Sequence, residues 1–205
     1  MNIPVKTGVR MVMNPRLRKF ALSAHVTSSV GWLGSVAAFL AVAVVALTSA
    51  DDFKARSASI TMELIGWFVI VPFSGASLLS GVIQSLGTQW GLFRHYWVIA
   101  KLLITVGASL LLMLHMRVVS SIALAASSDA ASSSHLQGPK MQVLADAGAA
   151  VIVLLIAVGL SIYKPPGRTD EPAPRWVRVS GAAIALLVVA FVLRHVAGGG
   201  MHGRH

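Results

Sequence analysis

The residues best suited to chemistry in this sequence are a few ionisable side chains that fall within long apolar runs or at their edges. Such residues are costly inside a membrane, so each is a candidate functional residue. The candidates for binding a cofactor are His25, His95, Lys101 and His115. The candidates for binding a metal ion are His25, His115 and His195. No residue is assigned a catalytic role from the sequence.

Paired histidines are the first chemistry that these residues suggest. Two histidines from different helices at one depth could hold a bis-histidine haem b or a copper ion, because imidazole offers a neutral nitrogen donor. We expect His25 and His95 near the cytoplasmic side, at a depth similar to that of Lys101. We expect His115 and His195 near the outer side. A lone histidine near the end of a span also fits an interfacial or hydrogen-bonded structural role.

Lys101 belongs to a periodic pattern in the third apolar run. Arg94, Lys101, Ala108 and His115 follow one another at intervals of seven residues. Seven residues are close to two helical turns, so the pattern places them near one helix face. Two interpretations of Lys101 stay open. Its ammonium group extends to the cytoplasmic surface, or it faces the bundle and pairs with an anion such as a propionate or another carboxylate.

The motifs of common soluble enzymes are absent from the sequence. It has no glycine-rich phosphate loop, no His-Glu-x-x-His and no Gly-x-Ser-x-Gly. With seven acidic residues, most of them in loops or at span edges, it gives little support to paired-carboxylate catalysis. It contains no cysteine, which excludes disulfides, thiolate metal sites and cysteine nucleophiles.

The composition identifies lipid as the solvent for much of the chain. Its 205 residues are 56% hydrophobic and 12% charged, and the mean hydropathy is +0.76. Soluble domains carry about 25% charged residues. The net charge of +10 comes from cations at the ends of apolar runs, where anionic lipid headgroups attract them. Nucleic acid is not an expected partner, because no basic patch is interleaved with exposed aromatics.

Five apolar runs predict an all-α, polytopic bundle of transmembrane helices, a four-span core plus one. The runs are 21–50, 60–86, 96–119, 145–163 and 177–196. Each is long enough to cross about 30 Å of hydrocarbon at about 1.5 Å per residue. The alternative is four spans and an interfacial helix, but the fifth run has no strongly polar face.

The predicted organisation of the chain has four parts. They are a basic cytoplasmic tail (1–20), the four-span core (21–168), a linker with the fifth span (169–197) and a flexible tail (198–205). Pro72 predicts a kink within the second span. Ser120–Ser134 is rich in Ala and Ser and predicts a mobile loop. The run Lys164-Pro165-Pro166 predicts a sharp end to the fourth span.

The distribution of Lys and Arg predicts the orientation. An amino terminus in the cytoplasm puts ten Lys and Arg inside and six outside, with Lys101 left out because it lies within a span. Cytoplasmic loops of membrane proteins are enriched in these cations. We therefore expect a multi-pass protein of a bacterial inner membrane with a cytoplasmic amino terminus.

Stripes of small residues predict close helix packing in two spans. In the first span they are Ser23, Thr27, Gly31 and Ser35, and in the second Ser77, Gly81 and Ser85. Small residues let helix backbones approach closely in lipid.

Several short segments carry a family resemblance. In the first span Leu22-Ser23-Ala24-His25 is followed by Trp32-Leu33-Gly34, and the third span has Trp97-Val98-Ile99-Ala100-Lys101-Leu102-Leu103, with His115 further on. These segments resemble the copper-resistance-D-like superfamily, which includes copper-resistance inner-membrane proteins and a haem-binding protoporphyrinogen oxidase. The segments 87–97 and 161–165 look like an uncharacterised bacterial membrane family of that superfamily. The resemblance covers roughly residues 20–168.

The resemblance implies a function that the composition does not. It makes His25 the first candidate ligand of haem or copper, and Lys101 a candidate second group. We therefore expect a membrane protein that binds haem b and has a redox role. The alternatives are a copper-tolerance or transport protein that binds copper, and a non-enzymatic subunit of a membrane complex or homo-oligomer.

Overall fold

The computed structural model describes residues 13–88, 91–128 and 137–179, and every named element in them is helical. The helices are α1 (Pro15–Thr48), α2 (Asp52–Ile65), the π-helical turn η1 (Gly66–Ile70), α3 (Val71–Leu86), α4 (Tyr96–Ser127) and α5 (Gln137–Tyr163). α2, η1 and α3 form one continuous helix, so the described residues hold four helices long and apolar enough to cross a membrane. The predicted all-α class and the first four spans are thus confirmed at this level, and the protein is a membrane-embedded helical bundle.

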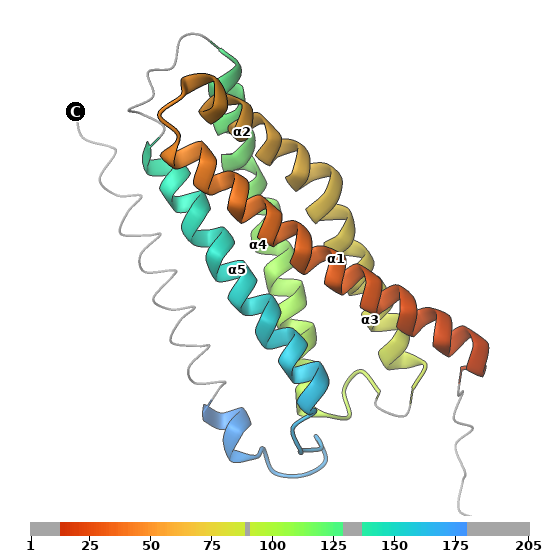
Figure 1. Cartoon of the computed structure of the whole chain (residues 1–205). Helices are drawn as coiled ribbons and strands as arrows, with labels where there is room; N and C mark the ends of the chain where they lie inside the picture. The colour runs from red at the N-terminus through yellow and green to blue at the C-terminus, as the bar shows by residue number, and fades with distance from the viewer. Residues whose placement is uncertain (1–12, 89–90, 129–136, 180–205) are drawn as a thin grey trace, which may run out of the picture.

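The four long helices form a bundle in which chain neighbours pack side by side (Figure 1). α1 packs on α2, α3 and α5, and α4 packs on the same three helices. α1 and α4 therefore lie diagonally opposite across the bundle. The core between them is apolar and includes Trp32, Phe39, Met62, Met116 and Val143.

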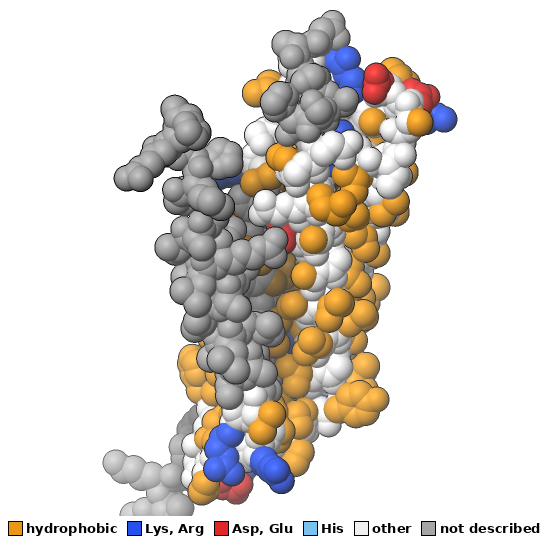
Figure 2. Space-filling model, turned by 90° about the vertical axis from the view of Figure 1, so that its left-hand side faces the viewer, with side chains coloured by type: hydrophobic (Ala, Val, Ile, Leu, Met, Phe, Trp, Pro, Cys, Tyr) orange, Lys and Arg blue, Asp and Glu red, His pale blue; other side chains and the backbone are white. Residues whose placement is uncertain are grey.

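The surface follows the pattern expected of a bilayer protein. Figure 2 shows hydrophobic side chains along the length of the described surface, with Lys and Arg gathered at its two ends. One end holds Met13, whose amide donates to the Gly87 carbonyl, and the connection from α3 to α4. The opposite end holds the turn between α1 and α2.

α1 begins at Pro15, before the apolar run that starts at residue 21, so part of the predicted tail is helical. Proline is tolerated in the first helical turn, where its missing N–H has no helical partner. Asn14 caps the helix, since its Oδ1 accepts a hydrogen bond from the Arg16 amide at 3.0 Å.

The buried face of α1 differs from the predicted stripe of small residues. Ser23 and Thr27 are exposed, whereas Ser28, Trp32 and Ser35 are buried. Gly31 does meet its neighbour closely, because a Cβ there would lie 2.8 Å from the Phe73 ring. The buried face of α1 is therefore centred on the large side chain of Trp32, and only part of the small-residue stripe lies on it.

The second long helix changes its winding just before Pro72, where the sequence predicts a kink. The residues Gly66–Ile70 form a π-helical turn, in which the Val71 amide donates to the Gly66 carbonyl. Pro72 has no N–H to donate and crowds the preceding turn, so the local helix cannot keep a regular ladder.

The predicted loop Ser120–Ser134 is wrong in its first part, since α4 continues to Ser127. Alanine is the strongest helix former, and Ile122, Ala123 and Ala126 are buried against the bundle. Residues 129–136 lie outside the described part of the chain.

At the end of the bundle that holds the α1–α2 turn, two cations each bind a backbone carbonyl of a neighbouring helix. Arg56 Nε of α2 donates to the Ala126 carbonyl of α4 at 2.7 Å. Lys140 Nζ of α5 donates to the Ala46 carbonyl of α1 at 3.1 Å, with the lysine buried. The last carbonyls of a helix lack helical partners, and a basic side chain near them satisfies both hydrogen bonding and charge.

α5 ends at Tyr163, as the Lys164-Pro165-Pro166 run predicts. The chain then returns past the start of α4, where the Thr169 amide donates to the Arg94 carbonyl at 3.1 Å. The fifth apolar run is described only at residues 177–179. The rest of that run, His195 and the tail 198–205 lie outside the described residues.

Candidate functional site

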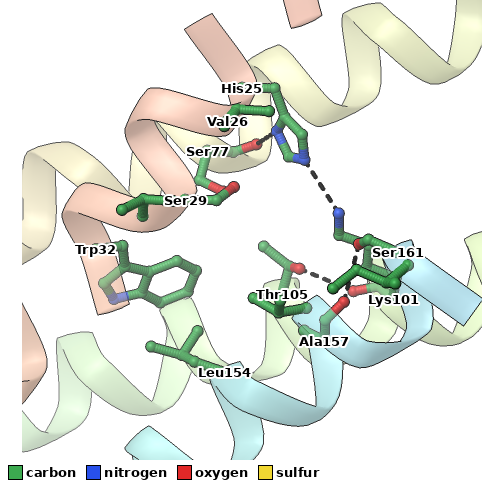
Figure 3. A pocket seen from close by; sticks show the side chains of 13 residues that line it. His25, Val26, Ser29, Trp32, Ser77, Lys101, Thr105, Leu154, Ala157 and Ser161 are labelled. Atoms are coloured by element: carbon green, nitrogen blue, oxygen red, sulfur yellow. Dashed lines mark hydrogen bonds between the residues drawn. The ribbon is translucent and has the colours of Figure 1, made fainter. Parts of the chain in front are cut away.

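A cavity of about 260 Å³ lies inside the bundle near the end that holds Met13. It is formed mainly by α1, α4 and α5, and Ser77 of α3 contributes to one wall (Figure 3). Its polar lining residues are His25, Ser29, Ser77, Lys101, Thr105 and Ser161. The remaining lining is apolar and includes Trp32 and Leu154, which lie away from Lys101 in this view.

The imidazole of His25 is fixed by α3. Its Nδ1 lies 3.1 Å from the Ser77 carbonyl oxygen and 3.2 Å from Ser80 Oγ. A carbonyl can only accept a hydrogen bond, so Nδ1 carries the proton and donates it to Ser77. The other ring nitrogen, Nε2, is therefore left with its lone pair.

Lys101 Nζ lies 3.1 Å from that lone pair on His25 Nε2. The lysine therefore faces the bundle and bridges the diagonal between α4 and α1. An amine carries more than one N–H donor, and within the described residues this is the single hydrogen bond that its Nζ forms. No carboxylate in the described part of the chain forms an ion pair with Lys101.

Small residues of α3 allow the imidazole to approach. A Cβ added at Gly81 would lie 3.0 Å from His25 Cε1. Ser77 Oγ also forms a 2.8 Å hydrogen bond with Ser29 Oγ of α1. Ser77 and Gly81 belong to the predicted small-residue stripe, which was the signal for this contact, although their role in holding His25 was not predicted.

His95 does not join His25 in the cavity. It stands immediately before α4, pairs through its backbone with Arg168, and its ring centroid lies 6.5 Å from that of Trp97. The predicted pair of histidines near the cytoplasmic side is therefore not brought together.

His115 lies in the opposite half of the bundle. Its Nδ1 is 3.2 Å from Asp146 Oδ2 of α5, and the two side chains are 15% and 37% exposed. Its Nε2 is buried without a hydrogen-bond partner among the described residues. Fourteen residues separate it from Lys101, which corresponds to about 21 Å along α4. Asp146 was not predicted as its partner.

The residues as arranged do not fit a bis-histidine haem b. One histidine lines the cavity, and its Nε2 is in contact with Lys101. The cavity of about 260 Å³ is also below the range of about 300–1,000 Å³ usual for drug-sized ligands, and haem is larger than most of these. The described residues hold no cluster of three His, Cys, Asp or Glu side chains that would chelate copper.

The cavity opens sideways between α1 and α5. Val26 and Val30 of α1 and Ile162 of α5 line it and are 50%, 62% and 69% exposed. These residues lie within helices that are long and apolar enough to span the membrane. The opening therefore lies on a side of the bundle that carries exposed apolar side chains.

Comparison with family models, curated proteins and solved structures finds no match for this chain.

Proposed function

We propose that this protein binds a lipid-soluble small molecule whose polar head accepts a hydrogen bond from Lys101. The observation that carries the proposal is the contact between Lys101 and His25 at the wall of a membrane-embedded cavity. The ligand head is a carboxylate or a carbonyl group, and its apolar body lies toward Trp32 and Leu154.

The state of Lys101 supports a ligand with an acceptor group. A lysine inside a bilayer is normally paired, because an unpartnered cation or donor is costly there. Among the described residues, the Nζ of Lys101 forms a hydrogen bond only with Nε2 of His25. A ligand oxygen would satisfy the remaining N–H donors.

The route of entry supports a lipid-soluble ligand. The cavity opens between Val30 and Ile162, whose side chains are apolar and exposed. A strongly hydrated solute would lose its water before reaching the site, at a cost of several kcal/mol (roughly 2–7 for one amide or hydroxyl group). An amphiphile would already be dissolved in the membrane.

The test is binding of decanoate to the purified protein in lipid nanodiscs, measured by equilibrium dialysis. Lys101→Met keeps the length of the side chain and removes its donors, so we expect affinity to fall by at least about tenfold, the loss of one charge-assisted hydrogen bond. Ala157→Leu fills the cavity without changing a polar group and should weaken binding similarly.

Lys54→Met is the matched control, because Lys54 is exposed at the other end of the bundle. It should bind decanoate as the unchanged protein does. Equal binding by the protein and both cavity variants would refute the proposal.

The same purified protein can be tested for bound haem b and for bound copper. An absorption spectrum with a Soret band that disappears in His25→Ala would replace the proposal with haem binding, as the superfamily resemblance implies. Stoichiometric copper in elemental analysis would favour the copper-tolerance alternative.

A further inference from the structure

We propose that Lys101 is a nucleophile that captures a lipid-soluble aldehyde or ketone as a Schiff base, with His25 as its proton acceptor. This inference rests on the proposed ligand site and names the head group that the site takes. It concerns covalent attachment, which reversible binding of a carboxylate does not require.

Two successive contacts, from Lys101 to His25 and from His25 to Ser77, support the inference. Lys101 Nζ lies 3.1 Å from His25 Nε2, and His25 Nδ1 lies 3.1 Å from the Ser77 carbonyl. A nucleophile within hydrogen-bond reach of a base, which is itself oriented by a third group, is the arrangement of activated nucleophiles in enzymes. The carbonyl of Ser77 fixes the tautomer of His25 in which Nε2 can accept a proton.

The surroundings of Lys101 also distinguish it from the other described lysines. Lys54 pairs with Asp51, and Lys140 is bound to the carbonyl of Ala46. Lys19 and Lys164 are exposed at the helix ends. Lys101 alone among these lines the cavity, and it has no carboxylate partner among the described residues. Lysines that form Schiff bases are typically desolvated in this way.

The chemistry needs no further reagent. The lone pair of Lys101 Nζ attacks the carbonyl carbon and forms a C–N bond, while the carbonyl π electrons move to oxygen. His25 Nε2 takes the proton released from nitrogen and passes it to that oxygen, which gives a carbinolamine. The hydroxyl group then leaves as water together with the second proton from nitrogen, so the C–O bond and the remaining N–H bond break and the C=N bond forms. One amine and one carbonyl thus yield one imine and one water, with no change in oxidation state.

The experiment traps the imine. The protein in nanodiscs is incubated with decanal and cyanoborohydride, and the alkylation of each lysine is followed by peptide mass spectrometry. We expect Lys101 to be labelled at least about tenfold faster than Lys54. His25→Gln should slow this labelling by about a hundredfold, because the base is lost.

A second variant keeps the test independent of changes at His25. Ala157→Leu leaves both reacting side chains in place and fills the cavity, so it should lower Lys101 labelling to the rate of Lys54. Free decanoate should compete with decanal for the same space.

The outcomes separate the two proposals. If decanoate binds but Lys101 is labelled no faster than Lys54, the Schiff base is wrong and the ligand site stands. If neither compound interacts with the cavity, both are wrong. Fast labelling of Lys101 that persists in Ala157→Leu would also refute capture in this cavity.

Discussion

At the scale of single residues, the position of His25 depends on the absence of a side chain at Gly81 of α3. The imidazole lies against Gly81, and its Nδ1 reaches the backbone of Ser77. A larger residue at position 81 would leave both hydrogen-bonding groups in place but would displace the ring between them. Adding one uncharged methyl group at position 81 would therefore change the geometry of the His25–Lys101 contact.

Gly81→Ala should weaken decanoate binding several-fold without removing any polar atom. The new Cβ would lie 3.0 Å from His25 Cε1, which is closer than carbon atoms pack, so the ring must move. Dialysis in nanodiscs measures the effect. Gly75→Ala in the same helix is the control, because no atom lies within 4 Å of its new Cβ, and it should bind normally.

Lys140→Met should destabilise the bundle by about 1–3 kcal/mol, because the Ala46 carbonyl loses its donor in a buried setting. Unfolding in mixed detergent micelles measures this. Lys54→Met removes a lysine that is 70% exposed, and surface changes of that kind usually stay within about 0.5 kcal/mol. Equal effects of the two variants would contradict the role given to Lys140.

At the scale of helices, the π-helical turn Gly66–Ile70 joins two segments that pack on α4. The turn places Gly66 directly against the end of the Met116 side chain, which is 1% exposed. Trp67 on the same turn donates from Nε1 to Ser120 Oγ at 3.1 Å. The irregular winding thus aligns the α2–α3 helix with α4 at two adjacent contacts.

Gly66→Ala should destabilise the bundle by about 1 kcal/mol, the low end of overpacking effects, because the atoms that it meets are the flexible end of the buried Met116 side chain. Met116→Val shortens the opposing side chain, so the double variant should be less destabilised than the sum of the two single variants. Gly34→Ala meets no atom within 4 Å and serves as the control. Additive effects would show that the two residues do not press on each other.

Much of the helical arrangement could be predicted from apolar runs and breakers, but not all of its boundaries. The proline pair after Lys164 correctly predicted the end of α5. The Ala- and Ser-rich composition of 120–127 also fits a loop, and the helix propensity of alanine together with the burial of Ile122 and Ala126 favours the helix. Sequence spacing along one helix also cannot give the register between helices.

Because the register between helices is missing from the sequence, individual residues of the site could be predicted but their contacts could not. His25 and Lys101 were each predicted as candidates, and the spacing of Lys101 and His115 placed them on one face of α4. The distance of 3.1 Å between Lys101 and His25 depends on how α1 crosses the bundle, as does the separation of His95 from the cavity. His115 likewise finds Asp146 through the packing of α4 on α5.

At the scale of the whole molecule, the four described spans put Met13 and the segment 164–179 at one end of the bundle. The exposed cations near this end include Arg16, Arg18, Lys19 and Arg168. At the other end, Arg56 and Lys140 bind helix carbonyls. Lys54 is also exposed at that end, so the cytoplasmic amino terminus stays a prediction from the Lys and Arg count.

The absence of native cysteine allows a direct test of this orientation. Ser128→Cys and Glu171→Cys place single thiols at exposed positions on opposite ends. A membrane-impermeant maleimide applied to intact bacterial cells should label Ser128→Cys, and should label Glu171→Cys only after permeabilisation. The reverse pattern would place the amino terminus outside.

If the proposed ligand enters through the sideways opening between Val30 and Ile162, its concentration in the membrane, and not in water, determines how much of the protein is occupied. A ligand that enters from the acyl chains is present at an areal density set by its partitioning, and its amount in water is a poor guide. Each additional methylene shifts partitioning by about 0.8 kcal/mol, so longer homologues would appear tighter in aqueous units without any new contact in the cavity. The fraction of protein occupied in a cell would then follow the ratio of ligand to lipid. At a fixed amount of ligand it would fall as the membrane expands.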